Sequence, residues 1–201
     1  MTFIVFEGGE GSGKSTQAES LATRLRADGR DVVLTYEPGD TKLGAQIRGM
    51  LLHVDEPIDA HTELLLMLAD RAEHVATVIR PALERGAVVV CDRFSPSTLA
   101  YQGVGRGLGV ELVDQLDQAA KGGLEPDAVV VLDVSDELAS ERRAHASDRF
   151  ERESGEFHHR VRESYRALAR ARGWFLVDGS GSVDEVETRV RASLGSLLDA
   201  D

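Results

Sequence analysis

Near its amino terminus the chain reads Gly8-Gly9-Glu10-Gly11-Ser12-Gly13-Lys14-Ser15. The spacing fits the pattern G-x-x-x-x-G-K-[ST], and the stretch lies between the apolar run Phe3 to Phe6 and an amphipathic helix. A glycine-rich turn of this kind lets backbone N–H groups face inward around phosphate oxygens, and the start of the next helix adds partial positive charge. We therefore predict a phosphate-binding loop that ends with Thr16.

Side chains in and near this loop carry chemistry of their own. Lys14 is expected to reach the β and γ phosphates of ATP, and Ser15 to coordinate Mg²⁺. A later apolar strand ends in Asp92-Arg93, at the edge where open α/β sheets bind ligands. We predict Asp92 as a magnesium ligand and Arg93 as a ligand of a substrate phosphate, although a surface ion pair would also fit this dipeptide. Asp133 ends another strand and is the second candidate, after Asp92, for the carboxylate near magnesium.

Short β-branched runs alternate with longer stretches of helical periodicity along the chain. This alternation predicts an α/β sandwich with right-handed crossovers, in which parallel strands are covered by helices on both faces. We expect a three-layer P-loop NTPase fold with a five-stranded parallel sheet. The expected strands are Thr2–Glu7, Val32–Tyr36, Ala87–Asp92, Ala128–Val134 and Trp174–Asp178, and the expected helices are Ser15–Ala27, Thr41–Leu52, Asp59–Ile79, Val110–Ala120, Phe157–Ala171 and Val183–Leu198.

Composition limits the size, partners and location of the protein. The 201 residues, 42% of them hydrophobic, can bury one substantial core, and no linker or repeat divides them, so we expect a single domain over residues 1–201. The formal net charge of −12 disfavours nucleic acid as a partner. Apolar runs are too short for a bilayer, no signal-peptide pattern is found, and the lone Cys91 needs no oxidising compartment. We expect a cytoplasmic protein without membrane contact.

The stretch over residues 142–155 is rich in charge and almost without apolar periodicity, which predicts a mobile surface segment. Phosphoryl transfer is usually assisted by an arginine, and none occupies the variable positions of the phosphate loop. We expect this segment to supply the arginine that assists transfer, and it would then close over ATP as a lid. The alternative is a solvated charge run in which acidic residues pair with the arginines. The arginines concerned are Arg142, Arg143, Arg149 and Arg152.

Further motifs run through nearly the whole chain. They are Phe3-Ile4-Val5-Phe6-Glu7-Gly8, Ser15-Thr16-Gln17, Glu37-Pro38-Gly39, Ala69-Asp70-Arg71-Ala72-Glu73-His74, Asp92-Arg93-Phe94, Ser97-Thr98-Leu99-Ala100-Tyr101-Gln102-Gly103 and Asp148-Arg149-Phe150-Glu151. Each is weak alone, but together they resemble the thymidylate kinase family, in which dTMP is phosphorylated to dTDP by Mg-ATP on the way to dTTP. An arginine in the lid and none in the phosphate loop is similar to the bacterial subtype.

The resemblance implies a role for each residue of the substrate site. Glu10 would contact the deoxyribose 3′-hydroxyl, and Arg48 and Arg93 would bind the dTMP phosphate. Arg71 would contact the thymine O4, Thr98 the polar edge of the ring, and Tyr101 would pack where a 2′-hydroxyl would lie. The other residues of the substrate site would be Met67, Ser97 and Gln102. Lys14, Arg149, Arg93 and Asp92 would carry catalysis. Taken alone, Arg71 would be a surface salt bridge, Tyr101 a core aromatic residue and Thr98 a helix cap.

The chain departs from the family pattern at three positions. The family usually has phenylalanine stacking on thymine where this chain has Met67, which still offers a polarizable apolar face. The family also commonly reads Arg-Glu-Pro-Gly-Gly-Thr, whereas here Tyr36 replaces the arginine and Asp40 the second glycine. A carboxylate near bound phosphate is unfavourable unless it is paired or turned away.

Two other functions remain open at this point. Met67 allows a kinase for another monophosphate, such as dUMP in place of dTMP. A nucleotide-binding regulatory module could keep the phosphate loop without transferring phosphate, although Asp92, Arg93 and the lid arginines argue against it. The resemblance also implies a homodimer formed through the helices expected over Asp59–Ile79 and Val110–Ala120, and Ser180 and Gly181 are candidates for adenine contacts.

Overall fold

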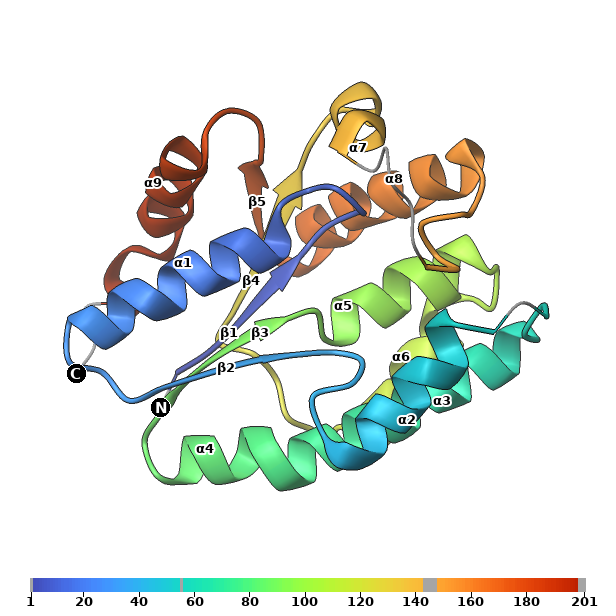
Figure 1. The fold of residues 1–201 in the computed structure, drawn as a ribbon, viewed down its shortest axis with the longest axis horizontal. Helices are drawn as coiled ribbons and strands as arrows, with labels where there is room; N and C mark the ends of the chain where they lie inside the picture. The colour runs from blue at the N-terminus through green and yellow to red at the C-terminus, as the bar shows by residue number, and fades with distance from the viewer. Residues whose placement is uncertain (1, 55, 143–147, 199–201) are drawn as a thin grey trace.

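The computed structural model describes residues 2–54, 56–142 and 148–198. Its centre is a five-stranded, all-parallel sheet in the order β2-β3-β1-β4-β5 (Figure 1). The strands are β1 (Thr2–Glu7), β2 (Val32–Tyr36), β3 (Val88–Asp92), β4 (Ala128–Asp133) and β5 (Phe175–Asp178). Each agrees with an expected strand to within one residue at either end, so the predicted fold is confirmed.

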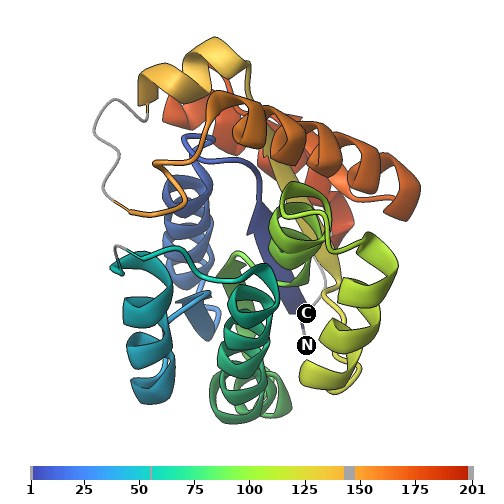
Figure 2. The ribbon, with the colours of Figure 1, turned by 90° about the vertical axis from the view of Figure 1, so that its right-hand side faces the viewer.

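The central strands β1, β3 and β4 are buried on both faces, which explains why they read as apolar runs rather than alternating ones. On one face Ile4 and Phe6 pack against α1 (Lys14–Ala27) and α9 (Val183–Leu194). On the other, Phe3 and Val5 pack against a larger set of helices. That set includes α2 (Lys42–Leu52), the helix from α3 (Ala60–His74) through η1 (Val75–Ile79) to α4 (Arg80–Glu84), and α8 (Gly155–Arg172). Helix α6 (Val110–Ala120) packs outside them, against α3 (Figure 2).

The strand order places the phosphate loop at a natural ligand site. Strand β1 pairs with β3 on one side and with β4 on the other. The connection after β1 leads to β2 on one side of it, whereas the connection after β3 leads to β4 on the other side. A crevice opens at the carboxyl ends of the strands where the strand order reverses in this way. Residues 8–13 follow β1 directly, and Asp92 and Asp133 end its two neighbours. The sheet thus brings to one edge the groups that the sequence predicted to meet.

Three helical segments were not expected from the sequence. Segment α5 (Ser95–Thr98) continues into the π-helical η2 (Leu99–Gly105), and α7 (Asp136–Arg142) follows β4. Pro96 and two glycines interrupt the apolar periodicity of the first pair. Helix α7 is short and charged, so that it shows no apolar stripe. The expected helix over Asp59–Ile79 is also longer than predicted, because a π-helical turn at Val75–Ile79 carries it into α4.

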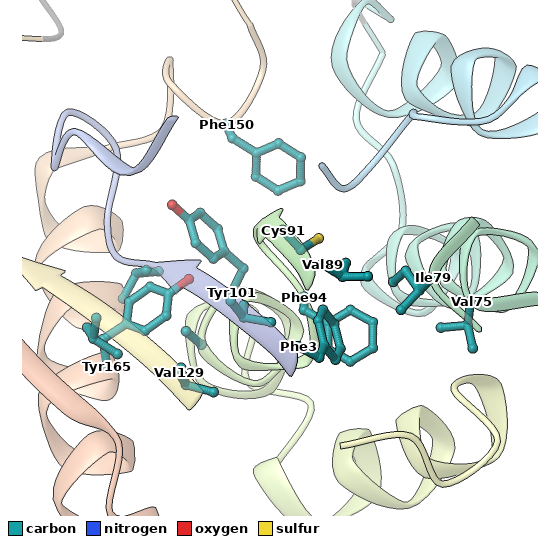
Figure 3. Packing of buried hydrophobic residues seen from close by; sticks show 14 of the residues in the cluster. Phe3, Val75, Ile79, Val89, Cys91, Phe94, Tyr101, Val129, Phe150 and Tyr165 are labelled. Atoms are coloured by element: carbon teal, nitrogen blue, oxygen red, sulfur yellow. The ribbon is translucent and has the colours of Figure 1, made fainter. Parts of the chain in front are cut away.

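The described part of the lid is packed, not fully exposed. Residues 143–147, Arg143 among them, lie outside the described residues. After them, Phe150 is only 5% exposed and its ring centre lies 5.8 Å from that of Tyr101. Figure 3 shows Tyr101 lying between Phe150 and the core around Phe3 and Phe94. The expectation of a mobile surface segment is therefore wrong at Phe150, because one aromatic residue in a charged stretch is enough to dock it.

Across the described ranges, no helix is both long enough and apolar enough to span a bilayer. Only η3 (Gly195–Leu197), a short 3₁₀ turn, follows α9 within these residues.

Candidate active site

The phosphate loop is held in the predicted shape by glycines at crowded positions. A Cβ on Gly8 would lie 2.4 Å from the Leu132 carbonyl oxygen, and Gly8, Gly11 and Gly13 all have positive φ angles. Only glycine adopts such angles without strain. Lys14 is buried under the loop, and its Nζ donates to the Gly9 carbonyl at 3.2 Å. The loop is thus set to turn its N–H groups and its lysine toward one point.

Ser15 and Asp92 meet as the sequence predicted. Ser15 Oγ donates to Asp92 Oδ2 at 2.5 Å, while Asp92 Oδ1 is buried and has no hydrogen-bond partner among the described residues. Mg²⁺ is commonly held by a hydroxyl or carboxylate together with phosphate oxygens and water, so this pair fits that ion. Asp133, by contrast, is bound by Arg166 Nε through both oxygens, at 3.0 and 2.9 Å. Asp133, ranked second from the sequence, is therefore engaged in an ion pair with α8.

A cavity of about 380 Å³ runs from the phosphate loop along the carboxyl edge of the sheet. That volume falls within the usual range for small-molecule sites. It is lined by Lys14, Ser15 and Asp92 and by all nine residues assigned to the substrate from the sequence: Glu10, Arg48, Met67, Arg71, Arg93, Ser97, Thr98, Tyr101 and Gln102. These residues come from four separate stretches of the chain, yet they line one space.

Arg93 and Glu10 form the wall of the cavity next to the phosphate loop. Arg93 Nη2 donates to Glu10 Oε1, and the Tyr101 hydroxyl donates to the same oxygen at 2.9 Å. Burial alone would raise the pKa of Glu10, but the positive charges of Arg93 and Lys14 outweigh it and hold the pKa at about 2. Arg93 also adopts a positive φ of 72°, which is uncommon for a residue other than glycine. This backbone conformation turns its side chain into the cavity and marks a constrained position.

Behind this wall, Glu7 fixes the segment that carries Arg93. Its carboxylate is fully buried and accepts from the Phe94 and Ser97 N–H groups at 2.8 and 3.2 Å, and from the hydroxyls of Ser97 and Tyr165 at 2.7 and 2.8 Å. Ser97 Oγ in turn accepts from Arg93 Nη1 at 3.2 Å. Burial raises the pKa of Glu7, against the opposing effect of Arg93 and these hydrogen bonds. The sequence placed Glu7 only within a motif and assigned it no role.

The departures at Tyr36 and Asp40 now have physical explanations. Arg48 stacks over the Tyr36 ring, with Cζ 5.6 Å from the ring centre, and donates from Nη1 to the Pro38 carbonyl at 2.6 Å. Tyr36 therefore supports the arginine expected at the substrate phosphate. Asp40 Oδ2 accepts from the hydroxyl of Thr35 in β2, so this carboxylate is paired within the protein.

Arg71 lies on the cavity floor and is far from being a surface salt bridge. Its side chain is only 3% exposed, and Nε donates to Glu37 Oε2 at 2.9 Å. Nη1 donates to Thr98 Oγ1 at 2.9 Å and to Asp117 Oδ1. Glu37 also binds His74 Nδ1 at 2.9 Å, so the histidine that had no sequence assignment belongs to this buried network.

Asp117 is a residue that sequence reasoning missed. It lies 46 residues from Arg71 on a helix whose visible pattern is only amphipathic, so no local signal could have paired the two. Asp70 was quoted within a motif without a role, and its Oδ1 accepts from the Gly39 N–H at 3.1 Å. Burial, with the nearby charge of Glu37, raises the pKa of Asp70 to about 6.

The lid arginines take two different positions. Arg149 does not line the cavity. Its Nη2 donates to Glu63 Oε2 at 2.6 Å and its Nε to the Leu51 carbonyl at 2.9 Å. Arg142, at the end of α7, donates from Nη1 to the carbonyls of Gly11 and Gly179, at 3.3 Å each. Arg142 therefore touches the phosphate loop in this structure, and Arg149 does not.

A second hollow, of about 250 Å³, lies on the far side of the phosphate loop. Arg142 forms one wall and the turn between β5 and α9 forms another, including Gly179, Gly181 and Ser182. Of the two residues suggested for adenine, Gly181 lines this hollow. Its position beside Gly13 and Thr16 suits the base of a nucleotide whose phosphates lie in the loop.

Comparisons with known proteins agree with this geometry. The sequence model of the family described as "Thymidylate kinase" matches residues 6–190. A thymidylate kinase from Ectopseudomonas mendocina (strain ymp) is 48% identical over 203 residues, which cover 98% of this chain and 97% of that protein. One from Synechococcus sp. (strain JA-2-3B'a(2-13)) is 51% identical over 190 residues, covering 94% and 91%.

A solved structure shows the same similarity in three dimensions. The crystal structure of thymidylate kinase from Ehrlichia chaffeensis superposes with a TM-score of 0.81 at 34% sequence identity. The match covers 96% of this chain and 97% of that one, so the similarity extends over the whole fold.

Proposed function

The chain belongs to the thymidylate kinase family, and from that membership we propose that it transfers the γ-phosphoryl group of ATP to dTMP, giving ADP and dTDP. The observation that supports this most directly is the single cavity shared by Lys14 and Ser15 of the phosphate loop and by the arginines Arg48, Arg71 and Arg93. A donor and an acceptor nucleotide, both anionic, need such a concentration of positive charge in order to meet.

The acceptor phosphate is assigned to Arg48 and Arg93. Both line the cavity, and each is held by a neighbour: Arg48 by the Tyr36 ring, and Arg93 by Glu10 and Ser97. Guanidinium groups suit this task because their planar fork can bind two phosphate oxygens at once. Glu10, ionised beside Arg93, offers an acceptor for a sugar hydroxyl, and the Tyr101 ring fills the space beneath the sugar.

The base is assigned to the floor of the cavity. Thr98 Oγ1 accepts from Arg71, so its own hydroxyl proton can be donated to a ligand, and Arg71 lies beside it as a second donor. Two donors side by side fit a keto oxygen such as O4 of thymine. Met67 lines the same space with Phe150, which adds an aromatic face that sequence analysis did not anticipate.

Transfer itself would be a matter of positioning and charge. An oxygen of the dTMP phosphate attacks the γ-phosphorus, the bond to the β–γ bridging oxygen breaks, and ADP leaves with the electron pair. Lys14 stabilises charge on the γ-phosphoryl group, and Arg149 is assigned the same task once it leaves Glu63. Mg²⁺, held by Ser15 and Asp92 with phosphate oxygens, would neutralise charge on the triphosphate.

We further propose one nucleotide-kinase domain over residues 1–201, with its lid at 142–155, acting in the cytoplasm as a homodimer. Three apolar side chains on α3 and α6 support the dimer, because they are unusually exposed and the two helices pack side by side. They are Leu65 at 59%, Leu112 at 42% and Leu116 at 37%.

Steady-state rates with Mg-ATP on dTMP, dUMP, CMP, UMP, AMP and GMP test the proposal. We expect dTMP to give the highest kcat/KM, and Lys14→Ala to abolish the activity while the protein keeps its far-UV circular dichroism. Equal or better activity on dUMP would indicate that Met67 has broadened the base site. Failure of every monophosphate to release ADP would favour the regulatory module.

A further inference from the structure

Gln102 lines the cavity, and the orientation of its side-chain amide is fixed by a residue outside the cavity, Glu63. Its Nε2 donates to Glu63 Oε1 at 2.8 Å, and the residue is 1% exposed. A carboxylate can accept hydrogen bonds but cannot donate them, so the amide nitrogen must face Glu63. The amide oxygen of Gln102 is therefore the atom that remains to be offered to a ligand.

Glu63 is itself held in place by two arginines. Its Oε2 accepts from Arg106 Nη2 at 3.0 Å and from Arg149 Nη2 at 2.6 Å, and Arg106 Nε also donates to Oε1 at 3.1 Å. The Glu63 side chain has no exposed surface. Glu63 does not line the cavity. Any effect that it has on a bound nucleotide must act through a neighbour.

The cavity floor thus presents donors and an acceptor in fixed places. Arg71 and Thr98 can donate, as argued above, and Gln102 Oε1 can accept. The imide edge of thymine or uracil carries a keto oxygen at C4 and an N–H at N3, which complements this arrangement. Cytosine carries an amino group at C4 and a bare nitrogen at N3, so both of its positions would face a group of the same kind.

We propose that Glu63 is a positioning residue for base recognition, which fixes the amide of Gln102 so that its oxygen meets the N3–H of the acceptor base. The inference rests on the proposed function, since it assumes that the acceptor base occupies this cavity. It also explains why the Glu63 carboxylate is buried behind the site. Without a neighbour that only accepts hydrogen bonds, the side-chain amide of Gln102 could rotate by half a turn and present its nitrogen to the base instead.

Glu63→Gln is the informative substitution. Arg106 Nη2 and Arg149 Nη2 both donate at the Oε2 position, so we expect the new amide to keep its oxygen there. Its nitrogen then faces Gln102, and the bond from Arg106 Nε to Oε1 is lost. Gln102 must then turn its own oxygen toward residue 63 and present its nitrogen to the base. We expect KM for dTMP to rise at least tenfold and the ratio of kcat/KM for dTMP to that for dCMP to fall by a similar factor, with KM for ATP unchanged.

Glu153→Gln is the matched control, because Glu153 binds Arg106 Nη1 at 2.6 Å but makes no contact with Gln102 in the described structure. It should leave the dTMP-to-dCMP ratio unaltered. A double-mutant cycle separates positioning from general weakening. In a Gln102→Met background, Glu63→Gln should no longer change KM for dTMP, although it can still change kcat through Arg149.

Several results would overturn the inference. They are an unchanged dTMP-to-dCMP ratio in Glu63→Gln, an undiminished effect of that substitution in the Gln102→Met background, or an unchanged ratio in Gln102→Met alone. The last of these decides the matter even if Glu63→Gln does not fold. A wild-type protein that fails to phosphorylate dTMP would contradict the proposed function instead, so the two failures are distinguishable.

Discussion

Arg149, the arginine predicted to take part in catalysis, donates from Nη2 to Glu63 Oε2 at 2.6 Å, and neither residue lines the cavity. Its backbone N–H and its Nε are bound to the carbonyls of Leu52 and Leu51 at the end of α2, at 3.3 and 2.9 Å. A role in transfer requires this side chain to exchange a buried carboxylate for phosphate oxygens. In this structure Arg149 is therefore paired with Glu63 and the end of α2, and not with the phosphate loop.

Arg149→Ala should lower kcat by about 10³-fold or more, which is the usual effect of removing an arginine that stabilises the transferring group. KM for dTMP should change little, because the contact is made in the transition state rather than in the ground state. Steady-state kinetics check both values. Arg152→Ala is the control, since Arg152 is exposed and its Nε binds only the Asp148 carbonyl of its own turn within the described contacts. An unchanged kcat in Arg149→Ala would remove Arg149 from catalysis.

Glu10 should make the free energy of unfolding depend on pH in the acidic range. Its pKa is held at about 2, below its ordinary value of 4.5, because the charges of Arg93 and Lys14 outweigh the effect of burial. The unfolded chain therefore binds more protons at this site between pH 4.5 and 2, so the contribution is complete above pH 4.5 and is lost as pH falls toward 2. A shift of this size corresponds to about 3 kcal/mol.

The test compares Glu10→Gln with the wild-type protein in urea unfolding at several pH values. We expect the variant to be less stable at pH 7, and the difference between the two proteins to shrink steadily below pH 4.5. Other carboxylates titrate in both proteins and cancel in that difference. A gap that stays constant down to the acid limit of folding would show that the Glu10–Arg93 pair does not contribute in this way.

The parts of the site that are continuous in sequence were the parts that could be predicted. Residues 8–15 carry their own turn, their glycine positions and the start of their helix, so local chemistry was enough. Asp92 was found because a strand end is visible in the sequence. Asp117 was not, since its partner Arg71 is 46 residues away, and its acidic side chain looks like any other on the solvated face of a helix.

Burial was the property that local pattern alone could not give. Taken alone, Arg71 among the acidic neighbours of its own helix would be a surface ion pair, and only the resemblance assigned it to the site. Glu37 and Asp117 reach it from other elements and allow it to be buried. Phe150 lies in a charged stretch with no periodicity, and it docks on Tyr101. In both cases the contact that buries the residue joins segments far apart in the sequence. The local pattern of apolar and polar residues cannot predict such a contact.

The exposed apolar side chains of α3 and α6 predict a dimer that a single charge can weaken. Leu65, on α3, is 59% exposed, and α3 packs against α6. Leu65→Glu would place a carboxylate in an apolar contact, and we expect it to shift the molecule from dimer to monomer in sedimentation equilibrium. Leu176→Glu, at an exposed position on the edge strand β5, is the control and should remain dimeric. A monomeric wild-type protein would contradict the assignment of this face.

Asp92 and Asp133 form a natural pair for testing the magnesium site, because each ends a strand next to β1 and only Asp92 reaches the phosphate loop. Asp92→Asn keeps the size of the side chain but removes its charge, so the Mg²⁺ concentration that gives half-maximal rate at fixed ATP should rise about tenfold or more. Asp133→Asn should leave that concentration unchanged, since Asp133 is bound to Arg166 at 2.9 Å and does not line the cavity. Titration of the initial rate with MgCl₂ measures the effect in both variants. Equal midpoints for Asp92→Asn and the wild-type protein would mean that the Ser15–Asp92 hydrogen bond serves only to close the loop against β3.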